Sequence, residues 1–597
     1  MSKYFVNLKI NNTPVKVEEG TTILQAARQA NFRIPTLCDH PDLQVAGNCR
    51  VCVVEVKGAK LLAAACATPV SEGMEVFTNS EKVRTSRKHI IELLLSEHNA
   101  DCTKCFKNGN CELQSLASEY RVGDHVFLDL VKPKDKILDI SSPSIVKDDS
   151  KCVRCQRCVR TCADLQGVSA LAVINKGDQQ KISTFLSKPL HDVVCTNCGQ
   201  CVNRCPTGAL TERNYIEEVW DAIYDPNKFV VVQTAPAVRI ALAEDLGFDP
   251  GLRVTGKMVS ALRRLGFNKV LDTDFSADLT IIEEGNELLT RLKKVLVDKD
   301  ESVALPMMTS CSPGWIKFQE HLFPGLLKNL STCKSPQQMF GALAKTYYAN
   351  KINIKAQDMI VVSIMPCTAK KYESNRPEMR DSGYQDVDYV LTTRELAMMI
   401  RQAGIDFEKL DDEHYDSILG ESTGAGVIFG ATGGVMEAAL RTAYEIVTGR
   451  EVPFNNLNIT PVRGMEGVKE AVIPITGVKP EWNFLEGVNL KVAVAHGLAN
   501  AKILMEKVSR GEADYHFIEI MGCPGGCLGG GGQPIPTSPE IRQKRAEAIY
   551  AEDESMSLRK SHENPEVISL YEDFLGDPNS HKAHEFLHTH YRPRKRY

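Results

Sequence analysis

The segment EIMGCPGGCLGGGG occupies residues 519–532 and places Cys523 and Cys527 just ahead of four consecutive glycines. Thiolates at this spacing suit iron–sulfur ligation. Glycines carry no Cβ atom and therefore let the backbone approach a bulky group closely, while Met521 offers an apolar wall. Fifteen cysteines precede this segment within the first 205 residues, a pattern typical of an electron-transfer relay. We therefore expect the relay to end at residues 519–532.

The size and composition of the chain are those of an ordinary globular protein. Its 597 residues predict about three to five domains at roughly 100–200 residues each. Hydrophobic content of 43% and charged content of 25% fall in the usual range, and a net charge of -5 gives no reason to expect nucleic acid as a partner. No apolar run approaches the ~18–20 residues that cross a bilayer, so we expect no membrane span.

Ten of the 20 cysteines stand in C-x2-C patterns. In a long chain whose N-terminus, MSKYFVNLKI, has no secretory signal, such patterns indicate metal binding rather than a disulfide framework. The expected location is a reducing, oxygen-poor cytoplasm, as in an anaerobe.

The first 80 residues predict a small β-rich domain with a ligand loop. Strands are expected at residues 4–10 and near 15–17, followed by a helix that Thr21 or Thr22 caps and that runs to about Ala30. The loop beyond it resembles that of a plant-type [2Fe–2S] ferredoxin, but its first gap is ten residues rather than four. A zinc site with one core cysteine is the alternative. The four cysteines are Cys38, Cys49, Cys52 and Cys66.

A second ligand set follows a helix expected at residues 82–96. Its members are His98, Cys102, Cys105 and Cys111. A histidine with three cysteines binds either zinc or a [4Fe–4S] cluster, and the spacing alone leaves both open.

The pattern C-x2-C-x2-C-x3-C then occurs twice, as in bacterial two-cluster ferredoxins, where the fourth cysteine of each run ligates the other cluster. This rule predicts two mixed [4Fe–4S] ligand sets. One contains Cys152, Cys155, Cys158 and Cys205, and the other contains Cys195, Cys198, Cys201 and Cys162.

Beyond Lys228 the pattern changes to alternating strands and helices, which predicts α/β layering. The expected elements are strands at 229–236, 359–364 and 491–496, and helices at 255–265, 286–297 and 392–403.

Three segments in this half carry the remaining cysteines: TSCSPGW at 309–315, MPCTAKKYE at 365–373, and residues 519–532. They resemble the three signature motifs of iron-only ([FeFe]) hydrogenases. With the relay in front of them, essentially the whole chain resembles the modular clostridial-type enzyme, and residues 559–591 are typical of the family's small-subunit region.

The resemblance implies an α+β multidomain protein, in which ferredoxin-like iron–sulfur domains precede a two-lobed α/β hydrogenase catalytic domain. The expected segments are a plant-type [2Fe–2S] domain at 1–80, a [4Fe–4S] segment with one histidine and three cysteine ligands at 81–125, a bacterial-type 2×[4Fe–4S] domain at 140–215, the catalytic domain at 228–535 and a small-subunit-like region at 536–597.

The resemblance also implies the cofactors: one [2Fe–2S] cluster, three accessory [4Fe–4S] clusters and an H-cluster. The H-cluster joins a [4Fe–4S] cubane to a two-iron unit with carbon monoxide, cyanide and a dithiolate amine. The implied cubane ligands are Cys367 and Cys523, and Cys527 is the implied thiolate that joins the two parts. Lys370 would bind one cyanide, and Pro236 and Ala237 would be backbone donors to the other. Met521 would lie against the two-iron unit, with Gln337 as a more distant polar residue.

The first motif departs from the family, because Cys311-Ser312 stands where well-studied members have two cysteines. In those members the second cysteine ligates the cubane and the first relays protons. Strict correspondence makes Cys311 the relay and Ser312 a poor ligand. Since thiolate far outranks a neutral hydroxyl as an iron ligand, we expect a local shift in which Cys311 ligates and Ser312 helps to carry protons. Both assignments remain open.

Three more residues match the family's proton path: Glu284, Glu287 and Ser331. Carboxylates and hydroxyls within hydrogen-bond reach pass protons between them. The alternative for the two glutamates is an exposed acidic helix face. Cys333, the one cysteine without a ligand role, is expected to be a small buried packing residue.

Together these features predict a hydrogenase that catalyses 2 H⁺ + 2 e⁻ ⇌ H₂. The implied partners are ferredoxin or NADH-oxidising flavin and iron–sulfur subunits, together with hydrogenase maturation proteins. Three alternatives are a subunit of an NADH-linked electron-bifurcating complex, a non-catalytic sensory or assembly relative, and an electron-transfer subunit of complex I type. The last explains residues 1–212 but leaves Cys367, Cys523 and Cys527 without a role.

Overall fold

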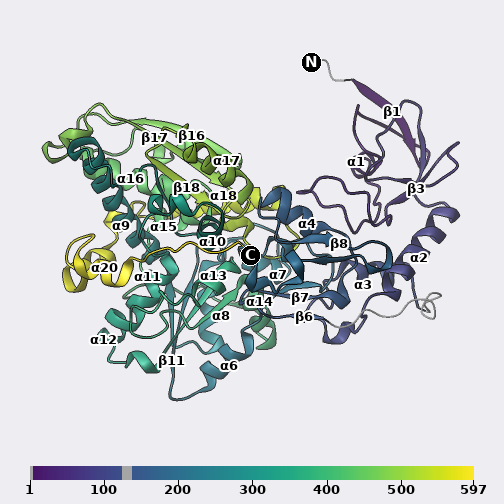
Figure 1. Ribbon diagram of the computed structural model, residues 1–597. Coiled ribbons are helices and arrows are strands. Elements are labelled where there is room, and N and C mark those ends of the chain that lie inside the picture. The colour runs from purple at the N-terminus through teal and green to yellow at the C-terminus, as the bar shows by residue number, and fades with distance from the viewer. Residues whose placement is uncertain (1–3, 124–136, 597) are drawn as a thin grey trace.

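The computed structural model describes residues 4–123 and 137–596. The predicted segments 1–80, 81–125 and 536–597 therefore each reach slightly outside the described residues. The chain runs from a small N-terminal domain through the cysteine-rich segments into a larger body with two lobes (Figure 1). Within the described ranges, no helix combines the length and apolarity that a membrane span requires.

The N-terminal domain is a five-stranded sheet in the order β2-β1-β5-β3-β4 with one short helix. The alternating burial of β1 packs Val6, Leu8 and Ile10 inward. Thr22 and Gln25 form a capping box at the start of the helix, where a threonine cap was expected. The elements are β1 (Phe5–Ile10), β2 (Thr13–Glu18), α1 (Ile23–Gln29), β3 (Val53–Val56), β4 (Ala63–Ala64) and β5 (Glu75–Phe77).

The predicted helix at 82–96 is confirmed as α2 (Glu81–Ser96), which Ser80 caps. A ferredoxin-like unit follows. Its short helix α5 (Gln200–Asn203) contacts the catalytic body, because Gln200 and Asn203 donate to the carbonyls of Gly529 and Gly530. Helix α3 (Glu112–Glu119) packs against α2 ahead of this unit. The elements of the unit are the sheet of β6 (Leu138–Asp139), β7 (Ile145–Asp148) and β10 (Leu210–Glu212), the hairpin of β8 (Ala172–Ile174) and β9 (Lys181–Ser183), and the short helices α4 (Arg157–Arg160) and α5.

The first catalytic lobe is a parallel sheet in the order β12-β11-β14-β15. Its predicted strands and helices are confirmed, with the exception described below. The elements are α6 (Ile216–Tyr224), β11 (Phe229–Thr234), α8 (Thr255–Leu265), β12 (Lys269–Asp272), β14 (Met359–Met365), β15 (Tyr389–Thr392) and α14 (Thr393–Gln402).

The helix expected at 286–297 begins 13 residues earlier, because α9 spans Thr273–Lys293 and a π-helical turn follows at 294–298. Every side chain from Thr273 to Glu284 is buried, so this half of the helix has no solvent-exposed face, and polar residues are mixed with apolar ones along it. The amphipathic period that marks a helix in sequence is therefore visible only in the second half.

The second lobe has a sheet in the order β13-β18-β17-β16, parallel apart from the edge strand β16. Helices α16 and α17 pack with it. The elements are β13 (Met307–Met308), α10 (Pro313–Leu322), α16 (Gly434–Thr448), β16 (Val468–Pro474), β17 (Asn489–His496), α17 (Leu498–Ser509) and β18 (Phe517–Met521). Helix α11 (Pro336–Leu343), which follows α10 in the chain, packs into the core of the first lobe.

The C-terminal region ties the two lobes together. Helix α18 (Pro539–Ser555) packs under the glycine-rich segment, while α19 (Pro565–Leu570) and α20 (His581–Leu587) lie beside α9 and α11 (Figure 1). After α20 the chain pairs with residues 332–334, because the amide of Thr589 donates to the carbonyl of Thr332 at 2.7 Å and that of Lys334 donates to Leu587 at 2.8 Å.

Candidate active site and electron relay

The three cysteine motifs of the catalytic half all follow the carboxyl ends of parallel strands. MPCTAKKYE begins at the end of β14, TSCSPGW lies just beyond β13, and the glycine-rich segment follows β18. In open α/β sheets, ligands bind at this edge of the strands. The site therefore forms where the carboxyl edges of the two lobes meet.

A cavity of about 80 Å³ lies at this junction. Most of its wall is apolar, and its few polar groups come from the predicted site residues. The lining residues are Ala235, Pro236, Thr273, Ala277, Cys311, Ser312, Pro313, Pro336, Gln337, Met365, Pro366, Cys367, Lys370, Phe429, Met521, Gly522, Cys523, Gly526, Cys527 and Gly530.

The glycine run beside the cavity is required by close backbone packing. A Cβ on Gly530 would lie 2.1 Å from the carbonyl oxygen of Pro366, and one on Gly531 would lie 2.2 Å from that of Cys198. Real Cβ atoms do not approach backbone oxygens so closely. The glycines therefore bring the segment of Cys527 against both the second motif and the relay.

Cys367, Cys523 and Cys527 face one another across the cavity. Burial, and then the charges of the neighbouring thiols, raise the pKa of Cys523 well above its ordinary value and that of Cys527 to about 12. Thiols in such surroundings lose their protons to a metal rather than to water. This donor set fits a cluster with thiolate ligands.

Lys370 and Gln337 supply the polar groups on one wall. Lys370 Nζ donates to the backbone carbonyl of Cys311 at 3.1 Å and to Glu373 Oε2 at 2.9 Å, which leaves one of its three N–H groups for a ligand. Gln337 Nε2 donates to Glu373 Oε2 at 3.1 Å. Gln337 Oε1 is buried with no hydrogen-bond partner among the described residues, but as an acceptor it does not attract an anion. The free N–H of Lys370 is therefore the group on this wall that suits an anionic ligand such as cyanide.

The expectation that Pro236 serves as a backbone donor is wrong, because proline has no N–H. Pro236 lines the cavity with Ala235, so it contributes its ring and carbonyl. Ala237 is fully buried beyond it, and its carbonyl accepts from Gln533 Nε2 at 2.9 Å.

Cys311 and Ser312 point to different neighbours. Burial, and then the charge of Glu284, raise the pKa of Cys311 well above its ordinary value, while Lys370 opposes this shift. The hydroxyl of Ser312 instead accepts from the amide of Gly522 at 3.2 Å, directly before Cys523. Cys311 thus lies near Glu284 on the proton-path side and near Cys527 on the cluster side, while Ser312 bonds next to the cubane ligand Cys523. The strict family correspondence and the local shift both remain predictions.

The predicted proton-path residues form a line outward from Cys311. Ser331 Oγ donates to Glu287 Oε2 at 2.8 Å and also interacts with Glu284. Burial, and then the charge of Glu287, raise the pKa of Glu284 to about 8. Glu284 is buried, whereas the side chain of Glu287 is 12% exposed. The two glutamates are therefore not the exposed helix face of the alternative interpretation.

Sequence reasoning missed Arg291, which holds Glu287 Oε1 at 2.6 Å. Its position four residues after Glu287 on the same helix is the signal that could have identified it. Thr273, Met365 and Phe429 also line the cavity. Met365 is the first residue of the second motif, but nothing local in the sequence distinguishes Thr273 or Phe429.

The paired ferredoxin motifs enclose two separate cavities. One is lined by Cys152, Cys155, Cys158 and Cys205. The other is lined by Cys162, Cys195, Cys198 and Cys201. The structure therefore brings together the two mixed sets that the spacing rule describes.

The remaining thiols gather nearer the N-terminus. Cys52 Sγ lies 3.4 Å from Cys66 Sγ, and Cys38 interacts with Cys49 and Cys66. Cys111 lies near Cys102 and Cys105, while His98 follows the C-terminal end of α2.

Two branches of the relay converge on one ferredoxin cavity. Cys38 of the first thiol set, Cys111 of the second and Cys155 of the ferredoxin-like unit belong to a single packed core. Arg160 Nη2, from the same ferredoxin motif, donates to the carbonyl of Cys38 at 2.6 Å. Electrons from either N-terminal set would therefore reach the site through the ferredoxin-like unit.

The relay meets the catalytic cavity at Cys198. Its thiol lies near Cys367 and Cys523, and Thr368 Oγ1 donates to the carbonyl of Asn197 at 2.7 Å. The second ferredoxin motif is thus in direct contact with two of the catalytic motifs.

Iron–sulfur relay domains that lead to a thiol-lined cavity between two α/β lobes define an iron–sulfur oxidoreductase. Comparison of the sequence with known protein families identifies which iron–sulfur oxidoreductases the chain resembles. Residues 228–531 match the iron only hydrogenase large subunit, C-terminal domain, and residues 539–594 match the iron hydrogenase small subunit. The chain belongs to the iron-only hydrogenase family.

The N-terminal matches identify the cluster-binding domains. They are a 2Fe-2S iron-sulfur cluster binding domain at 4–81, an NADH-ubiquinone oxidoreductase-G iron-sulfur binding region at 87–125 and the ferredoxin-like domain of NADH-quinone oxidoreductase subunit 3 at 142–211. The chain therefore combines [2Fe–2S] and [4Fe–4S] binding domains with an H-cluster domain.

Individual relatives cover nearly the whole chain. It is 51% identical to the NADP-reducing hydrogenase subunit HndD of Solidesulfovibrio fructosivorans over 99% of both chains. It is 40% identical to iron hydrogenase 1 of Clostridium pasteurianum over 98% of this chain and 99% of that one. The apo [FeFe]-hydrogenase HydA1 from Chlamydomonas reinhardtii matches with a TM-score of 0.58 and 45% identity, over 64% of this chain and 100% of that one. These comparisons indicate hydrogenase activity.

Proposed function

We propose that this chain catalyses 2 H⁺ + 2 e⁻ ⇌ H₂ as the hydrogen-converting subunit of a larger complex linked to NADP or NAD. One observation supports the catalytic half of the proposal: the three cysteine motifs line one cavity. The relay ends at Cys198 on one side of this cavity, and the line of glutamates begins at Cys311 on the other.

Different cavity residues would contact different parts of the H-cluster. Cys367 and Cys523 would hold the cubane as ligands, and Cys527 would be the thiolate that it shares with the two-iron unit. Lys370 would donate to an anionic ligand on one wall, with Gln337 beside it, and Met521 would exclude water from the other. When bound, the H-cluster supplies the redox chemistry that interconverts H₂ with protons and electrons.

Protons reach the cavity along the line of polar side chains. Glu287, the partly exposed member, takes a proton from solvent while Arg291 fixes its other oxygen. Ser331 bridges to Glu284, and Glu284 passes the proton to Cys311. The raised pKa of Glu284, about 8, suits a group that must carry a proton near neutrality.

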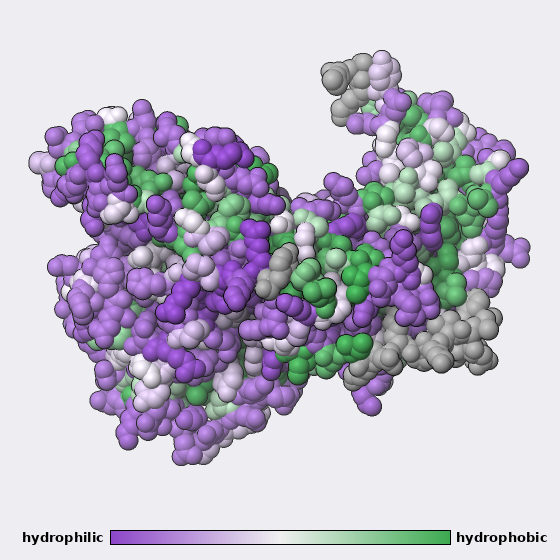
Figure 2. All heavy atoms as spheres, viewed as in Figure 1, coloured by the Kyte–Doolittle hydropathy of each residue, from purple (hydrophilic) through white to green (hydrophobic). Residues whose placement is uncertain are grey.

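Two observations support partner subunits at the iron–sulfur domains. HndD, the 51% identical relative, is itself named a subunit of an NADP-reducing hydrogenase. Large apolar side chains are also exposed on these domains, including Leu61 at 82%, Phe106 at 66% and Leu186 at 77%, and Figure 2 shows apolar surface over this part of the molecule. Exposed apolar groups of this kind suit a protein interface. Ferredoxin is the alternative electron partner, and maturation proteins that insert the two-iron unit in the cytoplasm are further partners.

The test compares the chain alone with native material purified without oxygen. The proposal predicts dye-linked H₂ turnover by the matured chain alone, but NAD(P)H-linked turnover only in native material that contains a flavin subunit. If native material has the mass of a single chain and turns over H₂ only with ferredoxin, the proposed complex is contradicted and the hydrogenase activity is still supported. No dye-linked turnover by fully matured chain would remove the catalytic proposal itself.

A further inference from the structure

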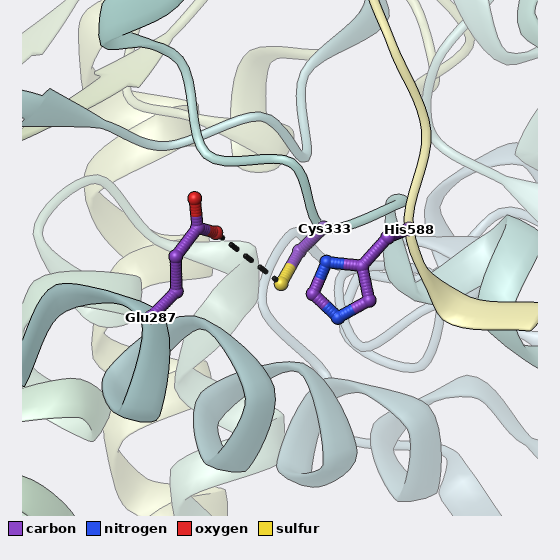
Figure 3. Close-up of side chains that lie close together, drawn as sticks. All are labelled: Glu287, Cys333 and His588. Atoms are coloured by element: carbon purple, nitrogen blue, oxygen red, sulfur yellow. Dashed lines mark hydrogen bonds between the residues drawn. The ribbon is translucent and has the colours of Figure 1, made fainter. Parts of the chain in front are cut away.

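Glu287, Cys333 and His588 form a compact cluster of three different metal-ligand types beside the proton path (Figure 3). One carboxylate oxygen, the sulfur and one ring nitrogen all lie within 4.8 Å of one another. The three residues come from α9, from the segment before α11 and from the chain after α20. Cys333 is fully buried and His588 is 6% exposed, whereas the Glu287 side chain opens the cluster to solvent.

Backbone pairing holds two of the residues in place. Cys333 and His588 face each other in an isolated antiparallel bridge. The flanking hydrogen bonds, from Lys334 N to Leu587 O and from Thr589 N to Thr332 O, fix their register. The fold therefore fixes the separation of the two backbones and keeps both side chains in one small region.

Neighbouring groups orient the ligand atoms. Arg291 holds Glu287 Oε1, which leaves Oε2 toward Cys333 Sγ at 3.9 Å. His588 Nε2 lies 3.0 Å from Glu283 Oε2, the carboxylate–histidine arrangement that commonly supports a metal-ligating imidazole. His588 Nδ1, now 2.8 Å from Thr332 Oγ1, is the nitrogen left for an ion.

We propose that Glu287, Cys333 and His588 form a binding site for a borderline-soft divalent cation of the zinc type. Thiolate sulfur, imidazole nitrogen and carboxylate oxygen are the three ligand types that Zn²⁺ takes, whereas Mg²⁺ and Ca²⁺ take oxygen. The thiolate of Cys333 and the carboxylates of Glu287 and Glu283 together balance the ion and the guanidinium of Arg291, as a buried ion requires. Water completes a four-coordinate site at the open side.

Binding involves proton release and no redox step. Zn²⁺ takes the sulfur of Cys333 as its thiolate, and the displaced thiol proton passes to solvent. Because the thiol must lose its proton to become a ligand, the ion competes with protons for the sulfur. Occupancy therefore increases as the pH rises.

The effect on turnover rests on the proposed function, in which Glu287 is the outer end of the proton path. A bound ion occupies Glu287 Oε2, the oxygen that now accepts from Ser331. Proton delivery to Glu284 then stops, while the cysteine sets of the relay stay untouched. The site is an inhibitory one, at which zinc slows hydrogen turnover without disturbing electron entry.

The experiment adds one equivalent of Zn²⁺ to the matured holoenzyme without oxygen and records zinc K-edge X-ray absorption, which is separate from the iron signal. We expect one sulfur at about 2.3 Å and nitrogen or oxygen at about 2.0–2.1 Å. Cys333→Ser keeps the side-chain volume but removes the sulfur, and His588→Gln tests the second ligand independently. His581→Gln, an exposed histidine at the start of α20, is the matched control. Retained carbonyl and cyanide infrared bands show that each variant has folded and matured.

The expected result is loss of the zinc–sulfur signal in Cys333→Ser, at least tenfold weaker zinc retention in Cys333→Ser and His588→Gln, and no change in His581→Gln. Zinc without a sulfur neighbour, or a spectrum that both ligand variants leave unchanged, would overturn the site. Turnover is measured on the same samples. Bound zinc with full turnover would support the site and contradict the assignment of Glu287 to the proton path, so the two failures are distinguishable.

Discussion

Gln200 Nε2 donates to the backbone carbonyl of Gly529 at 2.8 Å. Gln200 stands between the relay cysteines Cys198 and Cys201, and Gly529 lies two residues beyond Cys527. Both residues are buried, so close packing restricts the relative positions of the two segments that this hydrogen bond joins. The last relay motif and the active-site segment are therefore one packed unit, which keeps the final electron-transfer distance short and constant.

The glycine run makes this unit possible, which gives a first prediction. Gly531→Ala would put a Cβ 2.2 Å from the carbonyl oxygen of Cys198. We expect a loss of about 1–3 kcal/mol in unfolding free energy, as for other overpacked sites, together with slower dye-linked H₂ turnover. Thermal unfolding and turnover of the matured variant measure both. Gly325→Ala is the control, because nothing lies within 4 Å of the added Cβ. Equal behaviour of the two variants would contradict the packing argument.

A second prediction separates the roles of Cys311 and Ser312. Cys311 faces Glu284, and Ser312 bonds to Gly522. Cys311→Ala should therefore retain iron and the carbonyl and cyanide bands but lose turnover by roughly 100-fold or more, the usual scale for a lost proton-transfer group. Iron content, infrared spectra and H₂ uptake on one sample test this.

Ser312→Ala is the companion variant, and it should disturb the cubane more than the proton path. A Cys311→Ala protein that loses its cubane iron, while Ser312→Ala keeps it, would instead establish the local shift in which Cys311 is the ligand.

The third prediction concerns the pH dependence of turnover. Burial, and then Glu287, raise the pKa of Glu284 from 4.5 to about 8. Glu284 carries its proton below that value and loses it above, so H₂ formation should fall as the pH rises through about 8. Glu284→Gln should lower turnover by roughly 100-fold or more and abolish this step in the pH profile. Glu301→Gln, an exposed position, should leave the profile unchanged.

The same shift has a consequence for stability. Between pH 4.5 and about 8, the folded protein holds a proton on Glu284 that the unfolded chain has released. Stability from this group is therefore greatest below pH 4.5 and declines as the pH rises toward 8. Denaturant unfolding of wild type and Glu284→Gln should converge at low pH and diverge in favour of the variant at high pH. Parallel curves would show that Glu284 keeps an ordinary pKa.

The fourth prediction concerns Lys370, whose ammonium group bonds to the carbonyl of Cys311 and to Glu373 at the cavity wall. Lys370→Met removes the cation from an anionic ligand and leaves Glu373 without this partner. We expect less two-iron unit after maturation and shifted cyanide bands in whatever is retained. Lys345→Met is a matched control, because Lys345 also pairs with a carboxylate, Asp388, but lies outside the cavity. If the cyanide bands of Lys370→Met are identical to those of wild type, the predicted contact between Lys370 and a cyanide ligand is contradicted.

Much of this arrangement could be predicted because short motifs carry it. The C-x2-C spacing determines which thiols can reach one cluster, and strands such as 229–234 are apolar enough to be recognised alone. The capping residue Thr22 and the helix of residues 81–96 were likewise visible as local patterns.

What could not be predicted depends on contacts between distant segments. The first half of α9 is buried on every side and so lacks a helical period. The divergence of Cys311 and Ser312 depends on where Gly522 lies, and the pairing of Cys333 with His588 joins residues 255 positions apart. Family correspondence also placed a backbone donor on Pro236, where the chemistry of proline forbids one.

The most direct test of the central claim is infrared spectroscopy of the anaerobically matured protein, with H₂ turnover measured on the same sample. The account predicts carbonyl and cyanide bands together with dye-linked turnover. Bands without turnover would contradict the proton line from Glu287 to Cys311. No bands after full maturation would contradict the hydrogenase site itself and leave the chain a multi-cluster electron-transfer protein.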